Sequence, residues 1–179
     1  DTTEIDASGC VLRHVRVPGF EDLIRTEPIG ASFMYRREVH ETVGPYDESL
    51  FCAEDYDFWL RASRWFRFGC LHEDLYLYRL HGGTLTATQV DRVWRATNLS
   101  LEKTLPFLNW ATPAQKRGAH LQLAKYALNH GQLGNARRHA LKALPATFPW
   151  LLRQHRYAVV KLLAGERVLA LLLRIVTRR

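Results

Sequence analysis

Three carboxylates lie within four residues in the middle of the chain. Glu54, Asp55 and Asp57 stand where a polar loop is expected to pass into a helix. A carboxylate at such a junction can act as a general base when it lies within hydrogen-bond reach of the proton it removes. Neighbouring carboxylates raise the pKa of such a group and a helix N-terminus lowers it, so the spacing leaves the direction open. The same acids also fit a simpler role, because acidic residues in a first turn stabilise a helix.

The helix that carries these acids is predicted to run from Glu54 to Trp65. Asp57 and Arg61 are four residues apart, which predicts an ion pair on the helix surface. Apolar residues at helical spacing predict the face that packs on the core. The residues expected on that face are Phe58, Ala62 and Trp65.

The elements around this helix indicate an α/β fold. Residues 5–12 predict a strand, a polar turn with a glycine, and a second strand. The apolar run Gly30–Tyr35 predicts a short buried strand. Arg36–Val43 predicts a helix that stops at the following Gly-Pro pair, and Gly69–Tyr78 predicts extended chain.

Helical patterns replace this mixture from about residue 90 onward. Helices are predicted over Val90–Lys103, Pro113–His130 and Asn135–Leu144, and a last one over residues 150–177. The middle pair predicts a helical hairpin whose small residues are spaced as in one tetratricopeptide repeat. Small residues at any helix crossing give the same spacing, and one repeat is not stable alone. We therefore divide the chain into residues 1–90, of α/β class, and residues 91–179, all helical.

Charge divides the chain at the same point. Residues 1–90 contain nine Arg, no Lys and fifteen acidic residues, whereas the remainder contains sixteen basic and three acidic residues. The basic half is suited to an anionic membrane, to nucleic acid or to the acidic half, or it is simply a solvated surface. Its aromatic residues are not interleaved with basic ones as a stacking platform requires, which argues against nucleic acid. The last helix fits a peripheral membrane contact, because Leu-rich faces flanked by Arg suit lipid headgroups, but a buried packing helix or an oligomer contact is the favoured alternative.

The cysteines point to a reducing compartment. Cys10, Cys52 and Cys70 are odd in number and form no Cys-x-x-Cys pair, which argues against a disulfide framework and a zinc knuckle. No basic-then-apolar leader is visible, so the sequence shows no signal peptide. The cytoplasmic location that we expect is what the family resemblance described below implies. The chain begins with Asp1 rather than Met, and we expect it to be processed or part of something longer.

Four segments, in this order, resemble the acceptor-side half of a family 2 glycosyltransferase, an inverting enzyme of the GT-A fold. The small-residue and Arg-Arg segment, the "vGgyDe" turn, the "aEDyDlwlR" helix and the closing "LyxYRxH" of that family have counterparts here. The resemblance covers about residues 1–87. The matching segments are Gly30–Arg37, Val43–Glu48, Ala53–Arg61 and Leu75–His81.

The resemblance implies an activity and a base. Asp55 would be the catalytic base that removes the proton of an acceptor hydroxyl as it attacks a nucleotide-sugar, and Glu54 would support it and contact the acceptor. A divalent metal, Mg²⁺ or Mn²⁺, would neutralise the diphosphate leaving group. The expected partners are therefore a nucleotide-sugar donor and a glycan or other hydroxyl acceptor.

Three further residues take roles from the same resemblance, each with a plainer alternative. His81 would approach the metal or the diphosphate, and it also fits a polar loop beside two glycines. Arg79 would reach phosphate, or would pair with an acid such as Glu73. Trp59 would contact the substrate, although its position fits the core better than a sugar-stacking platform.

The chain departs from the family in one large respect. The strand–helix unit that binds the nucleotide and ends in an Asp-x-Asp metal motif is absent, and Asp55-Tyr56-Asp57 has that spacing but begins a helix. We therefore expect the chain to begin just past the donor site, and residues 1–179 alone to have little or no transferase activity. The competing hypothesis is a non-catalytic binding or scaffolding module built on a degenerate transferase domain.

Overall fold

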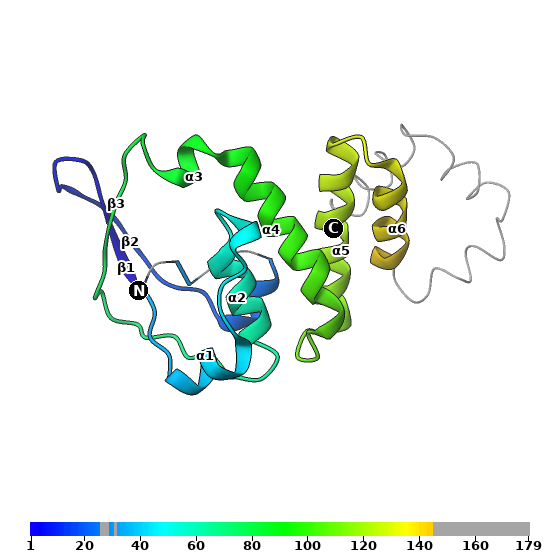
Figure 1. Cartoon of the computed structure of the whole chain (residues 1–179). Coiled ribbons are helices and arrows are strands. Elements are labelled where there is room, and N and C mark those ends of the chain that lie inside the picture. The colour runs from blue at the N-terminus through cyan, green and yellow to red at the C-terminus, as the bar shows by residue number, and fades with distance from the viewer. Residues whose placement is uncertain (26–28, 31, 145–179) are drawn as a thin grey trace, which may run out of the picture. The chain divides into compact units, whose positions relative to one another are not determined.

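The computed structural model describes residues 1–25, 29–30 and 32–144 (Figure 1). The chain forms two compact units, Asp1–Ala111 and Thr112–Arg179. The first unit is mixed α/β, so the α/β class predicted for the first part of the chain is confirmed at that level. The predicted last helix, residues 150–177, lies outside the described residues.

A small mixed sheet opens the first unit. Strands β1 (Thr2–Ile5) and β2 (Val11–Val15) form an antiparallel hairpin, which confirms the predicted strand–turn–strand. The Asp6 carboxylate accepts backbone N–H groups in the turn between them, and Gly9 adopts a φ of 96° there. Strand β3 (Leu77–Arg79) pairs in parallel with β1, so the order is β2-β1-β3.

The connection from β2 to β3 contains the helices that carry the acids. Helix α1 (Arg37–Val43) ends as predicted at Gly44, whose φ of 80° suits glycine. Helix α2 begins at Glu54 as predicted but ends at Ala62. The chain turns after that point, and Trp65 is 66% exposed, so the prediction that Trp65 faces the core is wrong.

The predicted buried strand at Gly30–Tyr35 is also wrong. None of the described residues of this run is in a strand, and Met34 is 98% exposed. Apolar composition alone does not supply a neighbouring strand to pair with. The aromatic side chains of the run lie against helix α2 instead, where Phe33 and Tyr35 each contact the ring of Trp59.

Helix α2 lies at the centre of the core of the first unit. Phe58 and Ala62 are fully buried, as predicted. Helix α4 (Val90–Thr104) packs on α2, and the chain then continues through η3 (Leu105–Phe107) to Ala111, so the compact unit extends past residue 90. The remaining elements of this unit are η1 (Phe20–Ile24), η2 (Glu48–Leu50) and α3 (Leu85–Thr88).

The described part of the second unit is the predicted helical hairpin. Helix α5 (Pro113–Asn129) begins with a capping box between Thr112 and Gln115, and α6 (Leu133–Ala143) follows a turn in which Gly131 has a φ of 70°. The two helices pack through buried alanines, Ala124, Ala127 and Ala136. Within the described residues, no helix combines the length and the hydropathy needed to cross a bilayer.

Candidate functional site

The chain enters helix α2 through an unusual backbone turn. Cys52 has a φ of 77°, a left-handed conformation that residues with a side chain adopt at a cost. Ala53 follows as the N-cap and offers no side-chain oxygen to the helix. The turn at Cys52 therefore sets where helix α2 begins, with Glu54 and Asp55 as its first two residues. The Oδ1 atom of Asp55 accepts a hydrogen bond from the N–H of Tyr56 at 2.7 Å.

The Asp55 carboxyl is partly buried, and this burial sets the direction of its pKa. Burial raises the pKa of Asp55 above its usual 3.8, the hydrogen bond from the Tyr56 N–H opposes the rise, and the charge of Glu54 adds to it. The sequence left open whether the helix N-terminus or the surroundings would prevail. The surroundings prevail, and a carboxylate with a raised pKa is a stronger proton acceptor once it is ionised.

Glu54 supplies a second oxygen that is prepared for a ligand. Its Oε2 atom is buried, and no hydrogen-bond partner for it is found within the described residues. A carboxylate oxygen only accepts hydrogen bonds, and leaving one buried without a donor is costly. Glu54 also lines the pocket described next, so its carboxylate contributes negative charge to that lining.

A pocket of about 590 Å³ lies beside the start of helix α2. Four of its lining residues are aromatic, and their side chains are only partly covered, between 37% and 45% exposed. Burial raises the pKa of Tyr46, and the charges of Tyr35, Asp55 and Glu54 add to the rise. The described lining residues are Phe33, Tyr35, His40, Pro45, Tyr46, Glu48, Phe51 and Glu54.

Two buried rings of α2 pack against the aromatic residues that line the pocket. Trp59 is 3% exposed and lies edge-on to Phe33, with ring centroids 4.8 Å apart. Phe58 lies edge-on to Tyr46 at 5.2 Å and tilted against Tyr35 at 5.4 Å. Trp59 thus occupies the core, in line with the plainer of its two expected roles, and acts on the pocket through the rings it supports.

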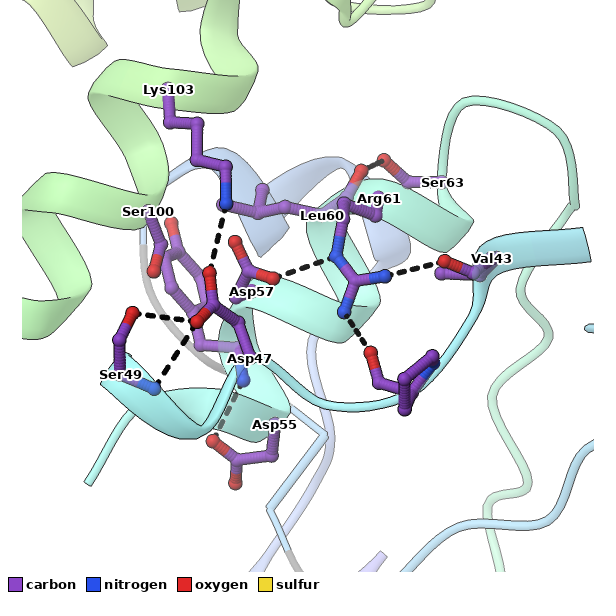
Figure 2. A network of polar contacts seen from close by, with 12 residues as sticks. Val43, Asp47, Ser49, Asp55, Asp57, Leu60, Arg61, Ser63, Ser100 and Lys103 are labelled. Atoms are coloured by element: carbon purple, nitrogen blue, oxygen red, sulfur yellow. Dashed lines mark hydrogen bonds and ion pairs between the residues drawn. The ribbon is translucent and has the colours of Figure 1, made fainter. Parts of the chain in front are cut away.

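An ion pair fixes α2 to the end of α1. The Nε atom of Arg61 lies 2.7 Å from Oδ2 of Asp57, which confirms the predicted pairing (Figure 2). The prediction that the pair lies on the surface is wrong, because Asp57 is completely buried. Arg61 also donates to the carbonyl oxygens of Val43 and Pro45, at 2.6 and 2.9 Å. The guanidinium therefore holds the turn before Tyr46 against the helix that carries Asp55.

A second polar contact holds the loop at η2. Asp47 caps η2 by accepting the backbone N–H and the hydroxyl of Ser49, at 3.2 and 2.6 Å. Its other oxygen lies 3.0 Å from Nζ of Lys103 on helix α4 (Figure 2). The Ser49 hydroxyl and the Lys103 ammonium together lower the pKa of Asp47 to about 2. The Asp47 carboxyl therefore stabilises the loop at η2 through these contacts.

Arg79 and His81 lie outside the pocket lining. The Nη1 atom of Arg79 donates to the carbonyl oxygens of Asp6 and Ala7, at 3.1 and 3.0 Å, so it bridges β3 to the turn after β1. The Nδ1 atom of His81 accepts the N–H of Gly83 at 3.2 Å. Of the predicted site residues, Glu54 alone is among the described lining residues of the pocket, and Asp55 follows it directly in helix α2.

A divalent metal does not fit the residues that are present. The described residues contain no group of three or more His, Cys, Asp or Glu side chains arranged to hold a metal ion. His81 alone offers one ring, and its Nδ1 atom is already hydrogen-bonded within its own loop. We therefore derive no chemical step through a metal from this part of the chain.

The sequence analysis missed most of the pocket lining. Tyr46 and Glu48 were noted only within a turn, and Phe33 and Tyr35 only within an expected strand. The usable signal was the density of aromatic residues on both sides of the acidic cluster, because rings interrupted by polar residues are typical of binding pockets.

Comparison with known proteins assigns the chain to no protein family. No family model, no curated protein and no solved structure matches the chain.

Proposed function

We propose that this chain supplies the acceptor side and the catalytic base of an inverting glycosyltransferase that uses a nucleotide-diphosphate sugar. The observation that carries the proposal is the position of Asp55: it is a partly buried carboxyl with a raised pKa, and it directly follows Glu54, which lines an aromatic pocket. Aromatic faces and a few polar groups are the usual lining of a site for a small organic molecule. The resemblance around Ala53–Arg61 supports the same role.

In the proposed reaction the acceptor lies in the pocket with one hydroxyl directed at Asp55. The carboxylate removes the hydroxyl proton while the acceptor oxygen forms a bond to the anomeric carbon of the donor sugar. The bond from that carbon to the diphosphate oxygen breaks on the opposite face, and the nucleoside diphosphate leaves with the electron pair. Attack opposite the leaving group inverts the configuration, and positioned base catalysis contributes about 10² to 10⁴-fold.

Glu54 and the rings orient the acceptor in this proposal. The Glu54 carboxylate accepts a hydrogen bond from the acceptor, and the ring faces of Tyr46 and Phe51 cover the apolar face of the acceptor. The resemblance assigns the donor and its metal to a half of the enzyme that has no counterpart in residues 1–179. Metal neutralisation of the leaving group belongs to that half.

The test compares variants of the protein as its gene encodes it. Nucleoside diphosphate release is measured with a panel of nucleotide-sugars, with and without simple glycoside acceptors. We expect Asp55→Asn to reduce acceptor-dependent release at least about 10²-fold. Glu73→Gln, an exposed carboxylate outside the pocket lining, is the matched control and should retain the activity. Equal release by Asp55→Asn and the unmodified protein would contradict the role of base and favour the non-catalytic binding module.

A further inference from the structure

The lining of the pocket at α2 is selective in its charge. Among the described residues that form it, two are carboxylates, Glu48 and Glu54, one is His40, and none is Lys or Arg. The four exposed rings add the negative potential of their faces. Such a lining attracts cations and repels carboxylates and phosphates.

Neighbouring cations leave these two carboxylates uncompensated. Arg61 is occupied by Asp57 and two carbonyl oxygens, and Lys103 by Asp47. Arg92 lies over the ring of Phe51, 4.8 Å from its centroid, and does not line the pocket. Within the described residues no ion pair involves Glu48 or Glu54.

The buried oxygen of Glu54 defines what a ligand must offer. Oε2 lacks a donor within the described residues, and it is removed from solvent. A hydroxyl or an ammonium group can donate to the Glu54 carboxylate that lines the pocket, whereas a carboxylate or a phosphate has no proton to donate. An ammonium group adds charge, and charge-assisted hydrogen bonds are about twice as strong as neutral ones.

From these observations we propose that the pocket binds a sugar that bears a protonated amine. The ammonium group lies against Glu54 and Glu48 and over the aromatic faces, as in cages of rings that bind organic cations. That the ligand is a sugar rests on the proposed function, and it names the acceptor class as amino sugars with a free amine. The preference for a cation rests on the pocket lining alone.

The test is direct binding, which needs neither donor nor turnover. Ligand-observed NMR titrations of the full gene product use methyl glycosides of glucosamine, glucose, N-acetylglucosamine and glucuronic acid. We expect the glucosamine glycoside to bind about 10-fold tighter than the glucose and N-acetylglucosamine glycosides, and the glucuronide to bind least. The advantage should vanish when the pH is raised enough to deprotonate the amine.

Matched variants locate the effect. Glu54→Gln keeps the shape and removes the charge, and it should bring the glucosamine and glucose glycosides to equal affinity. Glu48→Gln, at an exposed position, should reduce the preference even where Glu54→Gln proves unstable. Glu73→Gln should leave the preference unchanged. Amide NMR spectra establish that each variant is folded.

The outcomes separate this inference from the proposed function. Equal affinity for all four glycosides, or tightest binding of the glucuronide, overturns the amine preference whatever the transfer assay shows. A glucosamine preference that Glu54→Gln and Glu48→Gln abolish supports the inference even if Asp55→Asn has no effect on transfer. In that case the proposed base is rejected and the cation pocket is retained.

Discussion

Arg61 and Asp57 form an ion pair 2.7 Å long whose carboxylate is completely buried and whose guanidinium is only 20% exposed. The remaining N–H groups of Arg61 donate to Val43 and Pro45, in the turn that follows α1. One side chain therefore connects the helix that carries Asp55 to the turn that precedes Tyr46. The geometry of the pocket depends on this connection, although neither Arg61 nor Asp57 lines it.

Removing Arg61 should destabilise the first unit. Arg61→Ala leaves the Asp57 carboxylate buried without a counter-charge, and we expect a loss of about 3–5 kcal/mol in the free energy of unfolding. Arg61→Lys should recover little of it, because an ammonium group lacks the planar fork that reaches three acceptors. Urea denaturation measures both, with the exposed Arg67→Ala expected to change stability by less than about 0.5 kcal/mol. A loss as small as that in Arg61→Ala would show that the pair contributes little.

Asp55→Asn should make the protein more stable at neutral pH while it abolishes transfer. Because burial raises the pKa of Asp55 in the folded state, folding favours its protonated form. Its contribution to stability is full below the usual pKa of 3.8 and is lost as the pH rises through the raised value. An amide carries no charge, so the variant avoids this loss.

The measurement is the free energy of unfolding of both proteins by urea at neutral pH and again below the usual pKa of the carboxyl. The advantage of Asp55→Asn is expected at neutral pH and should disappear in acid. An advantage that persists unchanged in acid would show that burial of the charge is not its cause. Functional residues that lower stability in this way are a common observation.

The loop capped by Asp47 should lose its order in acid at a lower pH than an ordinary carboxyl would allow. The lowered pKa of about 2 means that the contribution of Asp47 is full above 3.8 and is lost as the pH falls through about 2. Ser49→Ala and Lys103→Ala should each raise this pKa, because the Ser49 hydroxyl is the largest single cause of the lowering and the Lys103 hydrogen bond is the next. NMR titration of the Asp47 carboxyl measures the shift, and Lys142→Ala on α6 should leave it unchanged.

Replacing Cys52 by glycine and by a β-branched residue should have different effects on stability. Its φ of 77° is accessible to glycine without strain and is strongly disfavoured for a β-branched side chain. We expect Cys52→Gly to be within about 1 kcal/mol of the unmodified protein, because relief of strain offsets the entropy of the unfolded glycine. Cys52→Val should lose about 1–3 kcal/mol. Thermal and urea unfolding of the two variants compare them directly, and equal stability would contradict strain at this turn.

Local spacing was enough to predict several elements of this protein. Each of these elements depends on residues that are close in the sequence. They are the helix that begins at Glu54, the helix end at Gly44, the β1–β2 and α5–α6 hairpins, and the pairing of Asp57 with Arg61. Caps, turns and contacts between residues four apart operate within one or two turns of the chain. A single sequence therefore contains the information needed to place them.

The tertiary structure alone shows which side chains are buried and which strands pair across long sequence separations. Parallel pairing of β3 with β1 joins residues more than seventy positions apart. The apolar run that contains Phe33 lines the pocket and does not form a strand. Asp57 is buried, although the spacing predicted an ion pair on the helix surface. The direction of the Asp55 pKa shift is of the same kind, because it depends on how much of the carboxyl its neighbours cover. The residue types and their spacing supply the acids and the rings, whereas the dielectric surroundings and the pocket exist only after distant segments have packed together.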